Sequence, residues 1–382
     1  MKPLRIAYFT HDSILEGVGR SQILALCRGL SDLGIEVNLY SFEKNQLNEN
    51  LKVLTYSKNL RWTPFDFNRI SFLGPFYRVF KLRQIRDKFD LIHARGDLPA
   101  LAAVLRKKEP VLWDIRSLWS EQRRILNPRK FNPITLWVLR RINHFISRRV
   151  SSYNTLTLSI MPYLNKHFPD LPDLHATIST CVDTNLFAFS KTLPRQPQAL
   201  LSGTYNKIYD NALIERFNSY MRSTYQHKVV WAKGNEADSR TQDLGHSEII
   251  ELTYDEMPSI IRESSYGIAM CKSGLGASLS AAMPTKIAEF LAIGRPVVVN
   301  SNLGDVQTQL VDKGVAIALN DIADIPAAAA KLIQILEDTK TPERCRRVAE
   351  EYFSLATALK NYTKLYKSML SSQSELKKTF TY

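Results

Sequence analysis

Short apolar runs and amphipathic stretches alternate along the first half of the chain. Residues 4–10 (LRIAYFT) are predicted to form a strand, and residues 21–33 a helix with apolar positions three or four apart. Gly34 marks the predicted end of that helix, and residues 37–42 (VNLYSF) form the next predicted strand. This strand–helix–strand order indicates a parallel sheet covered by helices on both faces.

The same order returns further along the chain. In the first half it is repeated by residues 90–93, 98–105 and 110–115. Beyond residue 195, short strands are predicted at 199–202, 228–232, 248–252, 266–270 and 296–299. The helices predicted between them include 211–223, 257–263 and 285–292. Residues 350–370 are predicted to form one helix with a tyrosine-rich apolar face.

The two series of strands and helices predict two Rossmann-like α/β domains in a chain of 382 residues. We place the first domain at residues 1–176 and the second at 198–350. Residues 177–197 have weak periodicity and are predicted to be a linker. A helix at about 352–370 precedes a polar tail, 371–382, which is expected to fray.

Composition and charge narrow the class of protein. The four cysteines are far apart and form no C-x-x-C pair, so reduced thiols are expected. We recognise no signal peptide and no apolar stretch of spanning length, and we expect a cytoplasmic protein. Residues 1–175 contain 28 Lys and Arg against 15 Asp and Glu, which is +13 of the chain's net +14. This asymmetry predicts an anionic partner for the first half.

Two glycines follow the first predicted strand, in the loop HDSILEGVGRSQ. Gly17 and Gly19 allow the backbone to approach a ligand closely, and the next helix directs its N-terminus to the same place. Gln22 stands where a full G-x-G-x-x-G motif has its third glycine. The alternative interpretation is a tight turn from strand to helix without a ligand.

The segment MPTKIAEFLAIGRPVVVN combines a helix, a turn and a buried strand. Pro284 suits the start of the helix, and Gly294 suits its end. At the carboxyl edge of the sheet, the carboxylate of Glu289 could accept two hydrogen bonds from a ribose diol. Lys286 and Lys272 could neutralise a pyrophosphate. The alternative for Glu289 is a solvated helix face.

This segment, followed by Gly304 and Asp305, resembles the donor-binding segment of glycosyltransferase family 4, a large group of retaining enzymes. The family pattern is P-x-K-x-x-E-x-x-A-x-G-x-P-V-V. Further segments that resemble the family follow its order along the chain: RIAYFTHD at the opening, DLIH at 90–93, TCVD at 180–183 with Phe187, and LSGT at 201–204 with Lys207.

The resemblance implies a GT-B fold, in which two Rossmann-like domains face a central cleft and the C-terminal helix crosses back to the first domain. It implies acceptor binding by the first domain and donor binding by the second. The implied reaction transfers a sugar from a UDP- or GDP-sugar to a glycan or lipid-linked acceptor, with retention, in cell-surface polysaccharide or glycoconjugate biosynthesis. No cofactor and no metal is expected, because no D-x-D motif stands at a strand end.

One position departs from the family pattern. The family has two glutamates in an E-x7-E pair, and Glu289 matches the second. Ala281 stands where the first, near the transferred sugar, would fall. Hydroxyl and N–H groups between Lys272 and Ser280 could replace that carboxylate.

The resemblance also assigns the remaining donor residues. The family places two basic residues at the diphosphate, where they stabilise the leaving nucleoside diphosphate. We therefore assign catalytic roles to Glu289, Lys207 and Lys272, with Lys233 as an alternative because Lys207 matches only loosely. The candidate donor-binding residues are Gly17, Gly19, Gly203, Thr204, Lys207, Lys272, Ser273, Pro284, Thr285, Lys286 and Glu289.

Four polar residues on the acceptor side follow strand-like runs (DLIHAR and VLWDIR): His93, Arg95, Asp114 and Arg116. Side chains at the carboxyl ends of parallel strands face the ligand crevice of such folds. Arg116 occupies the region where the family often has a histidine, and we assign it no role as a base.

Four alternative functions stay open. An NAD(P)-linked enzyme would need a full G-x-G-x-x-G motif. A nucleic-acid binder is suggested by basic clusters at 106–108, 140–141 and 148–149, but no nucleic-acid-binding motif accompanies them. Ala281 keeps open an inactive nucleotide-sugar-binding relative, and a sugar-nucleotide epimerase would share the fold.

A peripheral membrane contact is predicted from residues 69–88 (RISFLGPFYRVFKLRQIRDK), which interleave aromatic residues with cations. The basic stretch 140–149 adds further positive charge. The alternative is that the apolar residues pack on the core and the cations form a solvated face.

Overall fold

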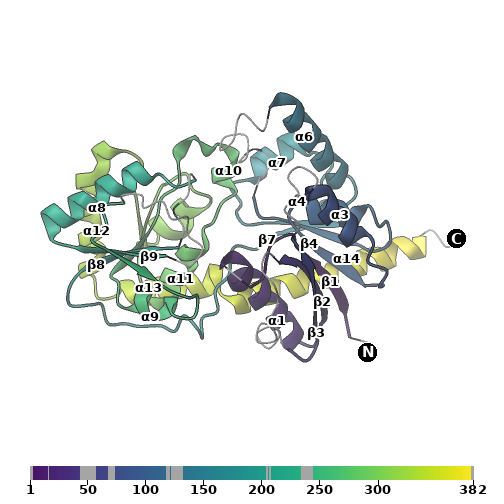
Figure 1. Ribbon diagram of the computed structural model, residues 1–382, viewed down its shortest axis with the longest axis horizontal. Coiled ribbons are helices and arrows are strands. Elements are labelled where there is room, and N and C mark those ends of the chain that lie inside the picture. Colours follow the sequence, from purple (N-terminus) through teal and green to yellow (C-terminus); the bar gives the residue numbers. More distant parts are fainter. Residues whose placement is uncertain are drawn as a thin grey trace. The chain divides into compact units, whose positions relative to one another are not determined.

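The computed structural model describes residues 3–15, 17–43, 57–67, 74–117, 121, 132–203, 205, 208–233 and 244–379, without the side chains of 373–379. The chain divides into two compact units. The first is Met1–Ile178 with Ala358–Tyr382, and the second is Ser179–Thr357. Each unit contains one parallel sheet with helices packed on it (Figure 1). The prediction of two parallel-sheet α/β domains is confirmed.

The first unit contains a seven-stranded sheet in the order β3-β2-β1-β4-β5-β6-β7. Its strands are β1 Arg5–Phe9, β2 Glu36–Glu43, β3 Leu60–Asp66, β4 Leu91–Arg95, β5 Val111–Ile115, β6 Ser152–Thr155 and β7 His175–Thr177. The chain builds outward from β1 to β3 and then returns to β4 on the other side of β1. Polar residues that follow β1, β4 and β5 therefore meet at one carboxyl edge.

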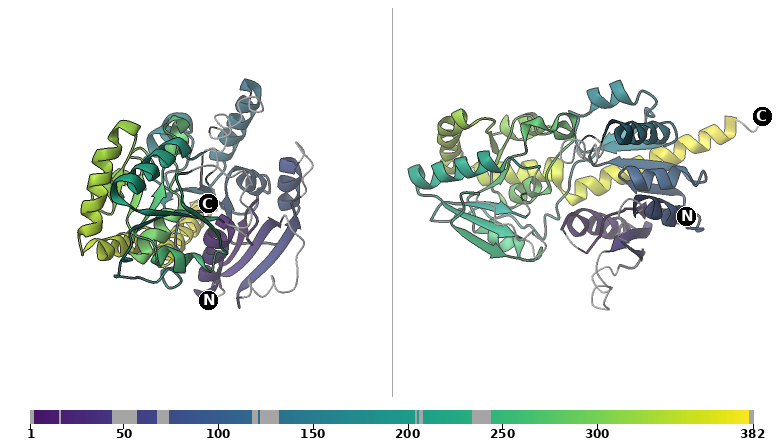
Figure 2. Two further views of the ribbon diagram at one scale, coloured as in Figure 1. Left: turned by 60° about the vertical axis from the view of Figure 1, so that its left-hand side comes forward. Right: turned by 45° about the horizontal axis from the view of Figure 1, so that its top comes forward.

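The helices of this unit are η1 Gly19–Leu24, α1 Ala25–Asp32, α3 Gly74–Arg83, α4 Asp97–Val104, α6 Pro133–Ser147, α7 Met161–His167 and α14 Leu355–Thr379. Helix α4 packs against both α3 and α6 (Figure 2). Helix α14 lies against α1, where a Cβ on Gly29 would stand 2.6 Å from Leu359. None of the helices in the described ranges is long and apolar enough to cross a bilayer.

The prediction of one helix over 350–370 is wrong. The π-helical turn η5 (Ala349–Phe353) ends at Ser354, whose extended backbone pairs in parallel with Val182. The Ser354 hydroxyl then caps α14 by accepting a hydrogen bond from Thr357 N at 3.1 Å. The helix continues to Thr379, so the start of the predicted polar tail is helical.

The second unit contains a six-stranded sheet in the order β10-β9-β8-β11-β12-β13. Its strands are β8 Gln198–Ser202, β9 Lys228–Lys233, β10 Glu248–Glu251, β11 Tyr266–Ala269, β12 Val297–Val299 and β13 Ala316–Ala318. Its helices are α8 Asn211–Tyr225, α9 Met257–Arg262, η2 Ser273–Leu275, α10 Ala277–Ser280, α11 Thr285–Ile293, η3 Gln307–Val311, η4 Ile322–Asp324, α12 Ile325–Glu337 and α13 Thr341–Val348. The strands predicted after residue 195 are confirmed within two residues at each end, and β13 is additional.

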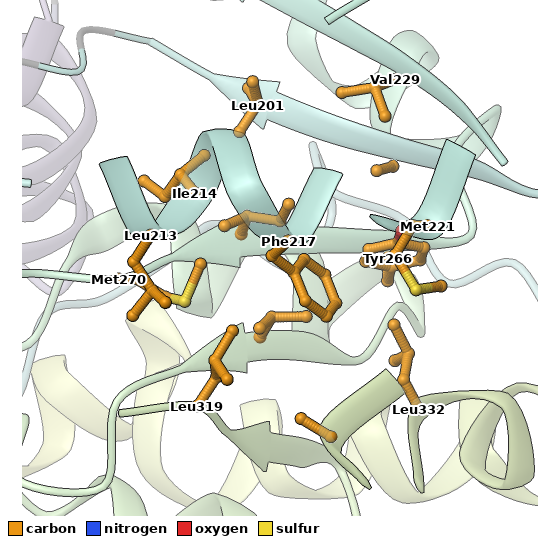
Figure 3. Close-up of a cluster of buried hydrophobic side chains, with 14 of the residues drawn as sticks. Leu201, Leu213, Ile214, Phe217, Met221, Val229, Tyr266, Met270, Leu319 and Leu332 are labelled. Atoms are coloured by element: carbon orange, nitrogen blue, oxygen red, sulfur yellow. The ribbon is translucent and has the colours of Figure 1, made fainter. Parts of the chain in front are cut away.

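Helix α8 covers one face of this sheet and forms a core with it (Figure 3). Leu213, Phe217 and Met221 recur every four residues, which places them on one side of the helix. Phe217 and Met221 are fully buried among side chains of β8, β9 and β11. This core holds the sheet in place. The donor-side residues lie at the carboxyl edge of that sheet.

Helix α11 lies unusually close to strand β11, because Gly267 has no side chain. A Cβ at Gly267 would lie 2.4 Å from the ring of Phe290, which is itself fully buried. Gly267→Ala is therefore expected to lower the free energy of unfolding by about 1–3 kcal/mol through overpacking, as urea unfolding would measure. Gly274→Ala is the control, since a Cβ there meets no atom within 4 Å. Equal losses in the two variants would contradict the close packing.

Candidate functional site

The first turn of α11 carries the most distinctive donor-side chemistry. The helix begins after Pro284, and no side chain caps its N-terminal N–H groups. Lys286 and Glu289 are one turn apart and are only 7% and 8% exposed. Free N–H groups at a helix N-terminus bind anionic oxygens, so a phosphate fits this end of the helix.

The ammonium of Lys286 has no hydrogen-bond acceptor among the described residues. Its Nζ lies 3.8 Å from the ring centroid of Tyr205 and 4.3 Å from that of Tyr209. Burial lowers the pKa of Lys286 to about 7, although Cys271 and Glu289 oppose that shift. A buried ammonium without an anion is energetically costly, and an anionic ligand would relieve the cost.

The carboxyl group of Glu289 is buried as well. Burial raises its pKa to about 7, against the attraction of Lys286. Among the described residues, the ammonium of Lys286 has no hydrogen-bond partner, so it does not bond to Glu289. The protonated amine of Lys286 is suited to a phosphate. The ionised carboxylate of Glu289 is suited to hydroxyl donors.

The turn after α11 has a structural role. Gly294 adopts φ +98° and ends the helix in the left-handed conformation. Arg295 is fully buried and donates to the carbonyl oxygens of Ser190, Thr192 and Arg262 at 2.7–2.9 Å. Its guanidinium group is therefore engaged by the backbone and ties the segment before β8 to this turn.

The other donor-side residues of the second unit are spread over its loops. Lys272 and Ser273 are exposed, and Gly203 adopts φ +74° after β8. Lys233 is buried with its Nζ 4.6 Å from the ring centroid of Trp231. Thr204 and Lys207 lie outside the described residues.

The remaining donor-side positions are Ala281 and the two residues before Lys286. Ala281 is 3% exposed, so that position contributes a buried methyl group in place of the family's first carboxylate. Pro284 and Thr285 are half-buried beside Lys286.

The two glycines after β1 belong to the first unit. Gly17 adopts φ +48° with open space where a Cβ would stand. At Gly19 a Cβ would lie 1.7 Å from the carbonyl oxygen of Ser13, so this glycine lets the chain's own loop pack on η1. The backbone at Gly19 thus makes its close approach to Ser13 and Ile14 of the same chain.

All four acceptor-side candidates meet around Asp114 at the carboxyl ends of β4 and β5. The Oδ2 atom of Asp114 lies 2.7 Å from Arg116 Nε, 3.2 Å from His93 Nε2 and 3.9 Å from Arg95 Nη1. His93 and Asp114 are completely buried. Arg95 also approaches Asp12, at 3.6 Å.

Helix α14 covers this cluster with two tyrosines. Tyr366 lies 2.7 Å from His93 Nδ1, and Tyr362 accepts a hydrogen bond from Arg116 at 3.1 Å. Asn154 of β6 donates to Asp114 Oδ1 at 2.8 Å. These three residues were not identified from the sequence, and the signal that could have found Asn154 is a polar side chain inside a short strand.

The charges in the cluster shift its pKa values in opposite directions. Burial alone would raise the pKa of Asp114, but Arg116, His93 and Arg95 hold it well below the ordinary value. Burial lowers the pKa of His93 despite its contact with Asp114. The cluster therefore contains a carboxylate, two guanidinium groups and a neutral imidazole at neutral pH.

The comparisons with known proteins agree with this fold. The family model described as Glycosyltransferase Family 4 matches residues 17–186. Sucrose-phosphate synthase from Thermosynechococcus elongatus has a TM-score of 0.74 at 13% identity, over 97% of this chain and 100% of that chain. A glycosyltransferase from Rickettsia africae has a TM-score of 0.70 at 15% identity, over 97% and 99%.

A third similar structure is HepE from Anabaena in complex with UDP and glucose, with a TM-score of 0.66 at 15% identity, over 96% of this chain and 100% of that chain. The search of curated proteins gave no match. The resemblance to glycosyltransferase family 4 is thus confirmed, and the family model covers residues 17–186. The chain has the GT-B fold of these glycosyltransferases, and its residues 17–186 match the family model.

Proposed function

We propose that the chain transfers a sugar from a UDP- or GDP-sugar to a glycan or lipid-linked acceptor, with retention, in the synthesis of a cell-surface polysaccharide or glycoconjugate. The observation that carries this proposal is the pair Lys286 and Glu289, both buried on α11, with no hydrogen-bond acceptor for the Lys286 ammonium among the described residues. HepE, which has the same fold, binds UDP and glucose.

We propose counterparts in the second unit for two groups of the donor, the diphosphate and the ribose. In the proposed complex, the diphosphate accepts hydrogen bonds from Lys286 and from the first N–H groups of α11. Glu289 accepts hydrogen bonds from the ribose diol. The exposed Lys272, with Lys207, stabilises the negative charge that develops on the diphosphate as its bond to the sugar breaks.

The transfer step needs no nucleophile from the protein. In the proposed reaction the bond from the sugar's anomeric carbon to the diphosphate oxygen breaks, and a bond to the acceptor oxygen forms on the same face. The leaving phosphate oxygen takes the proton of the acceptor hydroxyl. Lys286 and Lys272 would lower the barrier because they stabilise the leaving group.

A donor panel tests the proposal. The melting temperature is measured with UDP-, GDP- and ADP-sugars at saturating concentration, for the wild type and for Glu289→Gln. One nucleotide class should stabilise the wild type by about 2.7 kcal/mol at a hundred times its Kd, and should stabilise Glu289→Gln less. An unchanged melting temperature with every donor would contradict the proposed function.

We also propose that the first unit docks on an anionic membrane at the cytoplasmic face to reach a lipid-linked acceptor. Phe76 and Phe80 of α3 are 69% and 54% exposed, and Ile134 and Trp137 of α6 are 74% and 62% exposed. These side chains do not pack on the core, whereas Leu82 of α3 is buried and Tyr77 contacts Phe42. Both helices flank α4, and Arg141 lies 5.6 Å from the Trp137 ring.

Flotation with anionic vesicles checks the docking surface. The wild type should float at low salt, because exposed aromatic side chains enter the headgroup layer and each nearby cation contributes about 1 kcal/mol. Phe80→Ser with Trp137→Ser should stay with the soluble fraction, and Lys81→Glu with Arg83→Glu should float less. Leu158→Ser is the control, because Leu158 is also exposed (61%) but lies outside α3 and α6. Wild-type protein that stays soluble with anionic vesicles would refute the docking.

A further inference from the structure

Lys286 is held by two aromatic rings that come from a different part of the second unit. Tyr205 and Tyr209 follow β8, whereas Lys286 opens α11, some eighty residues later. The two ring centroids are 4.8 Å apart, with an angle of 46° between the ring planes. Both rings lie within cation–π distance of the same ammonium group.

The rings are themselves fixed in place. The hydroxyl of Tyr205 donates to the carbonyl oxygen of Ile268 in β11 at 2.5 Å. Tyr209 pairs with Cys271 in an antiparallel bridge, and Lys272 N donates to Ile208 O at 2.9 Å beside it. The backbone of β11 and of the residues after it therefore sets where the two rings stand.

Aromatic rings attract a cation without accepting its hydrogen bonds. The three N–H groups of Lys286 thus stay available, because the described residues offer them no acceptor. A carboxylate at the same place would form an ion pair and would repel a diphosphate. Two rings instead hold the ammonium for an anion that arrives from outside.

We propose that Tyr205 and Tyr209 are positioning residues that hold the Lys286 ammonium where it meets the diphosphate of the donor. This inference rests on the proposed function. It assigns the two tyrosines a role in recognition of the diphosphate and none in recognition of the nucleoside.

The test compares a variant of Tyr209 that keeps the aromatic ring with one that replaces it by an aliphatic side chain. Tyr209→Phe retains the aromatic face, whereas Tyr209→Leu loses it. The probes are UDP and GDP, and uridine and guanosine, which lack the diphosphate. Tyr209→Leu should weaken binding of the cognate diphosphate about fivefold to tenfold, and Tyr209→Phe should stay within about twofold of the wild type. The affinity for the matching nucleoside should not change in either variant.

A double-mutant cycle separates positioning from a general structural role. In a Lys286→Met background, Tyr209→Leu should cause no further loss of UDP or GDP binding, because the ammonium that the ring positions is gone. Additive losses, equal losses in Tyr209→Phe and Tyr209→Leu, or a loss of nucleoside binding would each overturn the inference alone. Wild-type protein that binds neither UDP nor GDP would overturn the proposed function together with it.

Discussion

Lys286→Met is expected to stabilise the protein by about 1–4 kcal/mol and to weaken binding of UDP or GDP tenfold to a hundredfold. Methionine has nearly the length of lysine and removes a buried ammonium that has no acceptor in the described structure. The same change removes a charged hydrogen-bond donor to the diphosphate. Thermal unfolding and titration calorimetry on one preparation measure both effects.

The stabilisation should depend on pH in a defined direction. The pKa of Lys286 in the folded protein is about 7, below its ordinary value of 10.5. Below pH 7 both the folded and the unfolded chain carry the proton, so the full cost of the buried charge is present. Between pH 7 and 10.5 the folded chain is neutral and the unfolded chain is still protonated, so the cost falls as the pH rises. Lys286→Met should therefore stabilise most below pH 7.

Glu289→Gln is the matched control with the opposite pH dependence. The pKa of Glu289 is raised from 4.5 to about 7, so the cost of its buried carboxylate is full above pH 7 and disappears below about 4.5. Glu289→Gln should thus stabilise most above pH 7. The same pH dependence in both variants, or a Lys286→Met protein that is destabilised at pH 6, would contradict a destabilising burial of these two charges.

Asp114→Ala is expected to lower the free energy of unfolding by about 3–5 kcal/mol, because it leaves buried partners without their anion. Arg116, His93 and Asn154 all lie within 3.2 Å of the Asp114 carboxylate. The pKa of Asp114 is held far below its ordinary value, so the carboxylate is ionised and the loss should be constant between about pH 5 and 8. Urea unfolding at several pH values measures it.

Tyr362→Phe provides the comparison for Asp114→Ala. It removes one hydroxyl that accepts hydrogen bonds from Arg116 and Asn154 but leaves the carboxylate in place. A loss of about 1 kcal/mol is expected. If Asp114→Ala costs no more than Tyr362→Phe, the carboxylate is not the centre of the cluster.

The strands of the second unit could be predicted because they are continuous apolar runs between turn residues. The apolar runs PVVV and KVVWA do not fit the periodicity of a helix. They form β12 and β9. Strand β3 was missed because Pro64 interrupts it, and the structure places β3 at the sheet edge, where a proline is tolerated. Strand β6 (SYNT) was missed because Asn154 makes a buried strand look like a loop.

The candidate site was predictable only where its residues are close in sequence. Lys286 and Glu289 stand in one motif and on one helix, so their spacing alone brought them together. The rings of Tyr205 and Tyr209 reach Lys286 because residue 209 pairs with Cys271, a contact across sixty residues that no local pattern reveals. The burial of His93 under Tyr366 depends on a helix 273 residues later.

Hydrogen–deuterium exchange of the wild type, with and without a saturating nucleotide-sugar chosen from the donor panel, tests the location of the donor site most directly. Binding should slow exchange in the first turn of α11, because the diphosphate engages the N–H groups there. Leu213–Met221 of α8, in the core of the same unit, should stay unchanged. Protection confined to other segments, with α11 unaffected in a protein that binds the donor, would contradict a donor site at Lys286 and Glu289.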